Sequence, residues 1–495
     1  MLERIFETPF RADQTLQQQI QERLIEAILA GKVSPYDPLP ATRVLSEQIG
    51  VSRNTVMLVY ERLAQDGYIR TVNRRGYFVD ESVLRDKLNV DVGGLVRPGE
   101  PVEAVDFTAH MTGRYSRQPN IVKRGDWKGY AYPFIYGQVA ADETSIARWR
   151  DCVRMAGTRR HAHAWVGDLV DGDDPMLIEQ IQRRMLPHRG FRAGPEELLV
   201  TVGAQNALFL AGALFCRPGA QVHLEDPCYV DARNIFAAQG GQLVPHAVDS
   251  NGMRMGDFSG AALVYVTPGH QAPTNVTMSM ERRLALLEAA RRDDFLIIED
   301  DYEHELNFIG AQHPTLKSLD VSGRVIHIGS LTKPLFPGLR LGFVAAAAPV
   351  IRELRALRRL MYRHPSALAQ RAMALFLAEG HYDTHIRRHR KELAARWKLM
   401  MRELDRQLPD CAVTMTTGGS GIWLALPEGV SARAVQRRAE QQGLLVESGD
   451  VHYHGTNAPK NRLRLGFGAI EARKIAEGIT LLGQVIAQER AQPPR

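Results

Sequence analysis

Residues 325–343, VIHIGSLTKPLFPGLRLGF, decide the fold. An apolar strand ends at Ser330, Lys333 follows it, and Arg340 comes seven residues after the lysine. A lysine just beyond the carboxyl end of a strand lies in the crevice where open α/β sheets bind ligands. Its amine can form a Schiff base with an aldehyde, and Ser330, Thr332 and Arg340 can bind a phosphate of the same ligand. An aldehyde and a phosphate together indicate pyridoxal 5′-phosphate (PLP) as the cofactor.

Other stretches supply what this cofactor needs, each just after an apolar strand. Asp300 ends FLIIED, where a carboxylate can keep a pyridine nitrogen protonated, and Tyr302 can hydrogen-bond the phenolic oxygen of the ring. Tyr229, after LED, can stack on the ring face. A turn in TVGAQNALF opens a helix whose free N–H groups can bind the phosphate. This turn consists of Gly203, Ala204 and Gln205.

The segments around these motifs alternate between strand and helix from about residue 195. Apolar, β-branched runs predict strands over 197–203, 221–226, 262–268, 295–300, 324–330 and 341–347. Helical stretches over 204–215, 229–240 and 278–292 separate several of them. This order predicts an α/β fold with a mostly parallel sheet. Residues 350–408 are strongly helical, and 411–485 return to strands and helices as a smaller α+β unit.

The N-terminal 80 residues predict a winged helix-turn-helix. A helix over 15–31 has its apolar residues at helical spacing, and a second helix runs from Pro40 to Gly50. Ser52 caps a third helix, which ends at Gly67. Two short strands, YIRT and GYFV, then form a basic hairpin, so this unit has the outline of a winged DNA-binding module.

Basic and polar side chains of this module are placed to contact DNA. The first turn of the third helix can face base edges, the second helix starts near the DNA backbone, and the hairpin tip can reach a groove or phosphates. Arginine suits these positions because its planar fork binds phosphate or guanine through two bonds. The candidate DNA-binding residues are Arg43, Ser52, Arg53, Asn54, Thr55, Arg74, Arg75 and Gly76.

Two resemblances follow from these motifs. Residues 39–79, with LPATR, VSRNTV, LAQDGYI and a basic wing, resemble the GntR-type winged helix. Residues from about 130 to 485 resemble fold-type I PLP enzymes of the aspartate aminotransferase-like group. That resemblance implies that Lys333 is the Schiff-base lysine, and that Arg464, in NRLRLGFG, pairs with a substrate carboxylate, with Arg462 as the alternative. It also implies a homodimer, and the two parts in this order resemble MocR/GabR-type regulators.

The sequence departs from working aminotransferases at several positions. In TPGHQAPTNVT, Asn275 stands where the enzymes have a glycine, and Gln271 and Ala272 stand where they have the asparagine that contacts the ring. Residues 165–181 lack the usual Tyr-x-x-x-x-Gly pattern. The tyrosine that reaches the phosphate from a partner subunit is not identified by its motif, and Tyr132 and Tyr136 are the candidates.

Length and composition set the outer limits. The chain of 495 residues is long enough for about three domains, and its 44% apolar and 24% charged residues are typical of globular proteins. Four cysteines cannot form a disulfide framework, and neither a signal peptide nor an apolar run of membrane-spanning length is evident, so we expect a cytoplasmic protein without membrane contact. The predicted division is a DNA-binding domain (1–80), a linker (81–125), a large PLP-binding domain (126–360) and a small C-terminal domain (361–495).

Together these features predict a PLP-dependent DNA-binding transcriptional regulator. It would sense a small amino acid or related amine by forming an external aldimine, and bind operator DNA. The alternative is an active aminotransferase with an accessory DNA-binding domain, and a third interpretation makes the PLP fold only a dimer scaffold. Residual or half-transaminase activity, the effector, the operator sequence, and activation versus repression stay open. We expect no metal: His381, His385 and His389 are interpreted as part of a solvated basic helix, whereas His452 and His454 are candidates for lining the effector pocket.

Overall fold

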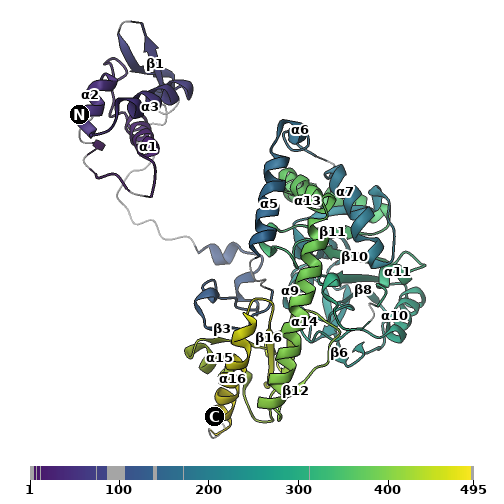
Figure 1. Ribbon diagram of the computed structural model, residues 1–495. Coiled ribbons are helices and arrows are strands. Elements are labelled where there is room, and N and C mark those ends of the chain that lie inside the picture. Colours follow the sequence, from purple (N-terminus) through teal and green to yellow (C-terminus); the bar gives the residue numbers. More distant parts are fainter. Residues whose placement is uncertain are drawn as a thin grey trace. The chain divides into compact units, whose positions relative to one another are not determined.

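The computed structural model describes residues 5–6, 8–11, 13–73, 75–85, 106–137, 142–170, 172–310 and 313–491. The chain divides into two units, residues 1–111 and 112–495, shown in Figure 1. Each unit has its own hydrophobic core, and each is described by itself.

The first unit contains three helices followed by a two-stranded hairpin. Its elements are α1 (Leu16–Leu29), α2 (Thr42–Ile49), α3 (Arg53–Gln65), β1 (Ile69–Val72), β2 (Gly76–Val79) and α4 (Glu81–Arg85). Both α1 and α2 pack on α3, whose Val56, Val59 and Leu63 are fully buried. The two strands pair antiparallel. The predicted three helices and basic hairpin are therefore confirmed.

Local signals set the ends of these helices. Thr15 accepts a hydrogen bond from the backbone N–H of Gln18 in a capping box at the start of α1. Gly50 adopts a left-handed conformation that ends α2. The Ser52 hydroxyl accepts from the N–H of Thr55 at 3.1 Å and opens α3. The result is a short turn that holds α2 against α3, as a helix-turn-helix requires.

An eight-stranded sheet forms the centre of the second unit. Its strands are β4 (Leu198–Thr201), β5 (Gln221–Asp226), β6 (Gln242–Asp249), β7 (Gly252–Met253), β8 (Ala261–Val266), β9 (Leu296–Asp301), β10 (Val325–Ser330) and β11 (Gly342–Ala345). Their order is β4-β11-β10-β9-β8-β5-β6-β7. The run from β10 to β6 is parallel, whereas β11 is antiparallel to both of its neighbours and β7 is antiparallel to β6. The predicted mostly parallel sheet is confirmed, with β6 and β7 as additions.

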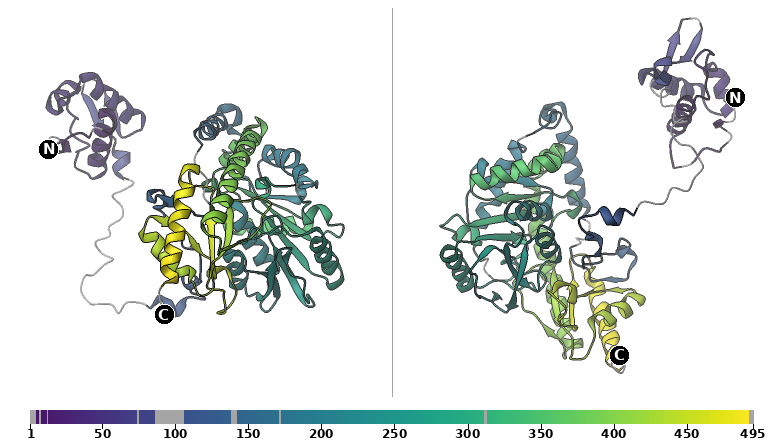
Figure 2. Two further views of the ribbon diagram at one scale, coloured as in Figure 1. Left: turned by 60° about the horizontal axis from the view of Figure 1, so that its bottom comes forward. Right: turned by 180° about the vertical axis from the view of Figure 1, so that it is seen from behind.

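Helices cover both faces of this sheet (Figure 2). One face packs against α8 (Gly203–Phe215), α9 (Val230–Ala238) and α12 (Ala348–Tyr362). The other packs against α5 (Glu143–Ala156), α7 (Pro175–Gln180), α10 (Met280–Asp293) and α13 (Ala367–Ala378). Alternate residues of each strand point to opposite cores, as Leu199 and Val200 of β4 do. Strands buried on both faces explain the unbroken apolar runs in the sequence.

A smaller sheet completes the second unit. Its strands are β12 (Ala412–Val413), β13 (Gly421–Ala425), β16 (Arg462–Gly466) and β15 (Glu447–Ser448), and it packs with α14 (His381–Gln407), α15 (Ala432–Gln441) and α16 (Ile475–Arg490). In Figure 1, α14 runs as a long helix from beside α13 toward β12. A separate parallel pair joins β3 (Tyr132–Pro133) to β14 (Leu444–Leu445). The chain entering the second unit is therefore anchored on its C-terminal, smaller part.

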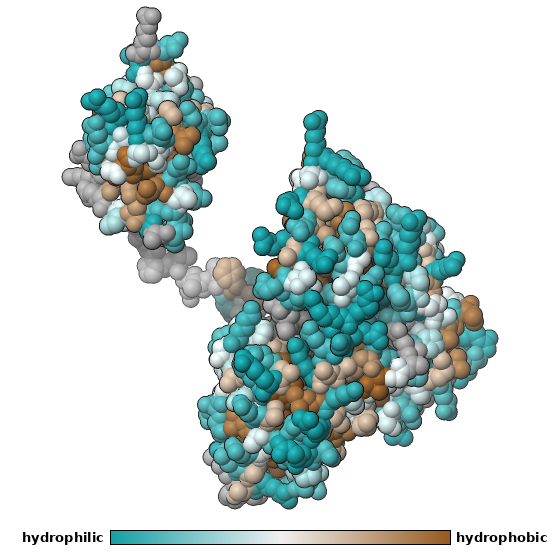
Figure 3. Space-filling view, viewed as in Figure 1, coloured by the Kyte–Doolittle hydropathy of each residue, from teal (hydrophilic) through white to brown (hydrophobic). Residues whose placement is uncertain are grey.

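The predicted linker is only partly covered, because residues 86–105 lie outside the described residues. Its flanks hold α4 and the short turns η3 (Phe107–His110) and η4 (Tyr115–Arg117), and η5 (Trp127–Gly129) follows it. Among the described helices, none is long and apolar enough to cross a membrane. Hydrophilic side chains cover most of the face of the second unit that Figure 3 shows.

Candidate functional site

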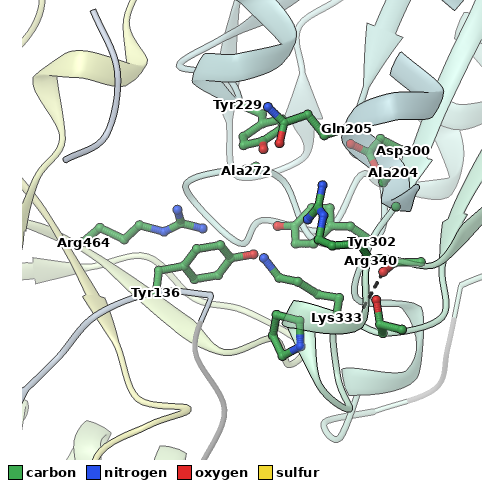
Figure 4. Close-up of a pocket in the computed structure, with 14 residues that line it drawn as sticks. Tyr136, Ala204, Gln205, Tyr229, Ala272, Asp300, Tyr302, Lys333, Arg340 and Arg464 are labelled. Atoms are coloured by element: carbon green, nitrogen blue, oxygen red, sulfur yellow. Dashed lines mark hydrogen bonds between the residues drawn. The ribbon is translucent and has the colours of Figure 1, made fainter. Parts of the chain in front are cut away.

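One pocket of the second unit brings together all of the cofactor residues predicted from sequence. It encloses about 650 Å³, its mouth included, at the carboxyl ends of β9 and β10, between the large and small sheets. Figure 4 shows its side chains converging from several elements. The lining residues are Tyr136, Gly203, Ala204, Gln205, Tyr229, Ala272, Asp300, Tyr302, Ser330, Thr332, Lys333, Pro337, Arg340 and Arg464.

Lys333 projects its amine into the middle of this pocket. The backbone N–H of Lys333 donates to the Ser330 hydroxyl at 3.1 Å, which fixes the turn after β10. The ammonium nitrogen lies 4.3 Å from the ring centroid of Tyr136 and 5.4 Å from that of Tyr302. Burial lowers the pKa of Lys333 to about 8. About a tenth of this amine is therefore neutral and nucleophilic at pH 7, far more than of a lysine with the ordinary pKa.

Asp300 lies near the end of β9, with one carboxylate oxygen hydrogen-bonded and the other without a partner among the described residues. Oδ2 accepts a hydrogen bond from the Tyr265 hydroxyl at 3.0 Å. Oδ1 is buried and has no hydrogen-bond partner among the described residues. Burial raises the pKa of Asp300 to about 7. An N–H donor of a bound ring would satisfy Oδ1 and favour the ionised carboxylate.

A cradle for a small anion lies at the start of α8. Gly203 has φ +74°, and a Cβ built there would lie 3.2 Å from Cζ of Arg340. Arg340 itself adopts φ +52°, which brings its guanidinium to the first turn of the helix. The Ser330 hydroxyl lies at the same edge of the sheet, whereas the Thr332 hydroxyl already bonds the backbone of Leu341. Helix N–H groups, a guanidinium and a hydroxyl together fit a phosphate.

Two tyrosines border the same pocket with their hydroxyls engaged. The Tyr302 hydroxyl donates to the carbonyl of His270 at 2.8 Å, so it offers a bound ring its oxygen as an acceptor. The Tyr229 hydroxyl donates to Asp231 at 3.0 Å, which fixes the ring at the pocket wall. In Figure 4, Tyr229 and Ala272 lie on the same side of the pocket. These positions leave an apolar ring face available for stacking.

Arg464 reaches the pocket from the smaller sheet. It is 1% exposed, and its Cζ lies 3.3 Å from the ring centroid of Tyr136. Its Nε and Nη2 atoms are buried without hydrogen-bond partners among the residues that the structure covers. A buried guanidinium with free donors is a site for an acid group. The alternative residue, Arg462, is not among the pocket-lining residues.

Tyr132 and Tyr136, the two candidates for the tyrosine that reaches the phosphate from a partner subunit, have different surroundings in the structure. Tyr136 lines the pocket of its own chain, and its hydroxyl donates to Glu303 at 3.0 Å. The Tyr132 hydroxyl instead donates to Glu477 of α16. Sequence reasoning missed Glu303, which also accepts from the Ser420 hydroxyl at 2.7 Å and so joins β9 to the smaller sheet.

A second missed residue is Lys123, within the predicted linker. Its ammonium nitrogen lies 3.2 Å, and that of Lys333 3.4 Å, from the position that a Cβ on Gly137 would occupy. Much of the Lys123 side chain is exposed, but burial around its amine lowers its pKa. The nearby Glu447 is half-buried, and burial of its carboxylate raises its pKa. No sequence motif marks either residue, because each comes from a segment far from the lysine motif.

Only one of the three residues that depart from the aminotransferase pattern in TPGHQAPTNVT lines the pocket. Ala272 lines the pocket, whereas the amide of Gln271 turns away and donates to the carbonyl of Pro227 at 2.7 Å. Asn275 has φ +61°, and its side-chain amide donates to the carbonyl of Gly421. Asparagine tolerates this left-handed conformation better than most residues. Its side chain therefore links the large sheet to the smaller one.

The other histidines do not line this pocket. Among the described lining residues, neither His452 nor His454 is present. His385 and His389 are buried on α14, which corrects the prediction of a solvated helix. His385 hydrogen-bonds the carbonyl of Pro334 at 2.9 Å. Within the described part of the chain, no cluster of three or more His, Cys, Asp or Glu could hold a metal.

The candidate DNA-binding residues lie on the first unit. Arg53 and Asn54 are exposed at the start of α3, directly after the capping Ser52. Arg43 is exposed on α2 and pairs with Glu47 at 3.5 Å, and Thr55 hydrogen-bonds Ser52 at 2.8 Å. At the hairpin, Gly76 has φ +105° and Arg75 lies over the ring of Phe78, whereas Arg74 lies outside the described residues.

Comparison with known proteins gives a consistent picture for both units. Residues 16–79 match the model of bacterial regulatory proteins of the gntR family, and residues 152–481 match that of aminotransferase class I and II. The chain is 37% identical to the HTH-type transcriptional regulator TauR of Rhodobacter capsulatus, over 95% of this chain and 96% of that protein. It is 30% identical to the probable rhizopine catabolism regulatory protein MocR of Rhizobium meliloti, over 95% and 94%.

Among solved structures, the second unit resembles aminotransferases. A kynurenine aminotransferase of Pyrococcus horikoshii, in complex with PMP, has a TM-score of 0.67 and 27% identity to this chain. The match covers 72% of this chain and 91% of that protein. It confirms the predicted fold of the large and small sheets with their helices.

Proposed function

The chain belongs to the MocR- and TauR-type HTH transcriptional regulators, and from this we propose that it controls transcription in response to a small amine. The amine is sensed with PLP in the pocket around Lys333. The observation that carries the proposal is this pocket, which combines a buried lysine of lowered pKa with an anion cradle and a free guanidinium. The protein acts in the cytoplasm, where its DNA partner is found.

The residues present fit PLP at each of its polar groups. The phosphate is held by the first turn of α8, Arg340 and Ser330, where Gly203 leaves room that a Cβ would fill. The ring nitrogen is held by the free oxygen of Asp300. When bound, PLP supplies an aldehyde that combines with amines and a ring that withdraws electrons. Lys333 provides the resident amine that an effector must displace.

Arg464 binds the acid group of the effector in this proposal. Its free Nε and Nη2 groups donate hydrogen bonds to a carboxylate or another acid group, while the effector's amine takes the place of the Lys333 amine. Tyr136 keeps Arg464 in place through its ring and keeps its own position through Glu303. The effector is therefore a small amino acid or a related amine that carries an acid group.

The first unit binds operator DNA in this proposal. The exposed first turn of α3 enters the major groove, and the hairpin contacts flanking phosphates. We propose a homodimer, since the resembled enzymes complete each site from two chains and a two-fold protein reads two half-sites. A monodisperse monomer in light scattering that still holds PLP would contradict the dimer.

Active transamination is the second candidate, and it is favoured by the intact set of Lys333, Asp300 and Arg340 in one pocket. A spectral titration separates the two. We expect amino acids to change the visible absorbance of the PLP-loaded protein and its affinity for operator DNA, without release of a keto acid. Sustained keto-acid release in step with added amino acid would favour the enzyme. An absence of any spectral response across amino acids would contradict sensing at Lys333.

A further inference from the structure

A second cavity of the second unit lies outside the pocket around Lys333. It lies between η6 (Ile181–Met185), η7 (Pro187–Arg189), the turn η9 (His304–Leu306) and the first half of α14. It encloses about 850 Å³ with its open mouth included, a size typical of small-molecule sites. The described residues that line it include none of those that line the pocket around Lys333.

Besides Nε of Arg189, which lies 3.3 Å from Oδ2 of Asp301, three buried oxygen atoms on residues of this cavity have no hydrogen-bond partner among the described residues. They are Oε2 of Glu305, Oδ1 of Asn307 and the hydroxyl of Tyr382. Tyr382 is 2% exposed and Asn307 is 9% exposed. Arg189 donates to the other oxygen of Glu305 at 2.8 Å and so leaves Oε2 free. Buried polar groups are nearly always paired, so three unpaired acceptors on one cavity point to an absent donor.

The mouth of the same cavity carries positive charge. Arg387 and Arg390 lie three residues apart on α14, and both are exposed. Neither has an ion-pair partner within the part of the chain that the structure describes, whereas Arg184 beside them pairs with Asp383 at 3.0 Å. Arg387 donates one hydrogen bond to the Thr384 hydroxyl at 3.3 Å, and its remaining donors can bind a carboxylate or sulfonate together with those of Arg390, one turn away.

We propose that this cavity is a second ligand site, for a small zwitterionic amino acid. The ligand's ammonium donates to Glu305, Asn307 and Tyr382, and its acid group binds Arg387 and Arg390. An ammonium has three N–H donors, which matches the three free acceptors. A dianion such as phosphate would bring negative charge toward Oε2 of Glu305. The inner acceptors thus favour a positively charged group and the outer guanidiniums a negatively charged one, so the cavity selects a small molecule that carries both.

The same stretch of chain builds both sites. Asp300 and Tyr302 line the pocket around Lys333, while His304 and Glu305 line the second cavity. Asp301 between them contacts Nδ1 of His304 at 2.8 Å and Nε of Arg189 at 3.3 Å. Glu305 follows Asp300 and Tyr302 in the same short stretch after β9. A ligand bound to Glu305 would therefore contact the chain segment that also carries two residues of the pocket around Lys333.

The test first blocks amine binding in the pocket around Lys333. Borohydride reduction of the PLP-loaded full chain fixes PLP to Lys333 through a secondary amine, so amines can no longer exchange there. Glycine, β-alanine and taurine are then titrated singly by calorimetry. We expect saturable binding of at least one of them, with one site per chain. Propionate and propylamine, which carry one charge each, should bind at least about tenfold more weakly.

Variants assign the binding to the cavity. Arg390→Ala and Arg387→Ala at the exposed mouth, and Glu305→Gln inside, should each weaken the zwitterion about tenfold or more. Lys391→Ala, next to Arg390 on α14 but outside the cavity lining, is the matched control and should bind like the parent. Melting curves show whether Glu305→Gln is folded. If it is not, Arg387→Ala and Arg390→Ala alone test whether the zwitterion binds in this cavity.

Three results would overturn the proposal. The first is the absence of saturation by all three zwitterions up to about 10 mM. The second is equal binding of propionate and the zwitterions, and the third is binding that all three variants leave unchanged. Because the cofactor pocket is fixed by reduction, these results do not depend on whether the protein senses amines through Lys333.

Discussion

The guanidinium of Arg464 lies over the ring of Tyr136, with its Cζ 3.3 Å from the ring centroid. The hydroxyl of that ring donates to Glu303, and the ammonium of Lys333 lies 4.3 Å from the ring centroid. Figure 4 shows Tyr136 between the arginine and the lysine. One ring from outside the large sheet therefore positions both charges that an amino acid effector would meet.

Arg464→Ala should weaken the response to amino acids. Charged hydrogen bonds contribute about 1.5–3 kcal/mol, so we expect the effector concentration at half response to rise roughly 10- to 150-fold. The readout is the visible absorbance of the PLP-loaded protein, titrated with the amino acid that changes it most in the parent. Arg462→Ala is the control. A normal response in Arg464→Ala would move the acid-binding site elsewhere.

Lys333→Ala should lose covalently attached PLP. The lysine amine is the nucleophile that lies in the pocket, and alanine has none. Mass spectrometry after borohydride reduction of each protein measures the attachment. PLP found on another lysine of the variant would show that the assignment is wrong.

Lys123→Met should raise the pKa of Lys333 above about 8, because a neighbouring positive charge that helps to lower it is gone. The rate of PLP uptake by the apoprotein should then reach its plateau at higher pH than in the parent. Lys128→Met is the control, since the ammonium of Lys128 lies over the ring of Trp127 instead. Identical pH profiles for Lys123→Met and the parent would place Lys123 outside the pocket.

Asp300 should make the apoprotein less stable as pH rises from about 4 to about 7. Its pKa is raised to about 7 in the folded chain, so the folded state keeps a proton that the unfolded chain has released over this range. The free energy of unfolding therefore falls with pH there, by on the order of 2–4 kcal/mol. Chemical denaturation of parent and Asp300→Asn apoproteins measures it. A pH dependence that Asp300→Asn retains in full would exclude Asp300 as its source.

Arg53→Ala should lower operator affinity by about 1–3 kcal/mol and relax sequence preference, because a base-edge contact is lost. Arg43→Ala should weaken binding to all sequences alike and reduce the salt dependence by about one unit. Fluorescence anisotropy at several salt concentrations distinguishes the two effects. Arg23→Ala on α1, whose guanidinium bonds backbone carbonyls of its own unit, is the control. Parent-like binding by Arg53→Ala would refute α3 as the recognition helix.

The parts of the site that the sequence predicts are those carried by local motifs. Lys333, Asp300 and the Gly203 turn each follow an apolar strand, and parallel strands bring their ends to one edge. Lys123 and Glu303 escape prediction because they join the site through contacts between distant segments. For His385 and His389, surrounding Arg and Lys residues suggested solvent, but the face of α14 that carries them is buried.

The pairing of β3 with β14 makes the smaller part of the second unit one of two anchors of residues 112–131. The other anchor is α9, where Asp231 accepts a hydrogen bond from Asn120 and Asn234 donates to the carbonyl of Pro119. Tension from the DNA-binding unit would reach these α9 contacts first and the two-residue parallel pair next. Single-molecule pulling through residues 112–131 should therefore show a weak early rupture ahead of the main unfolding event. The chain that leads to the DNA-binding unit thus shares its load between the helix that follows Tyr229 and the part that supplies Arg464.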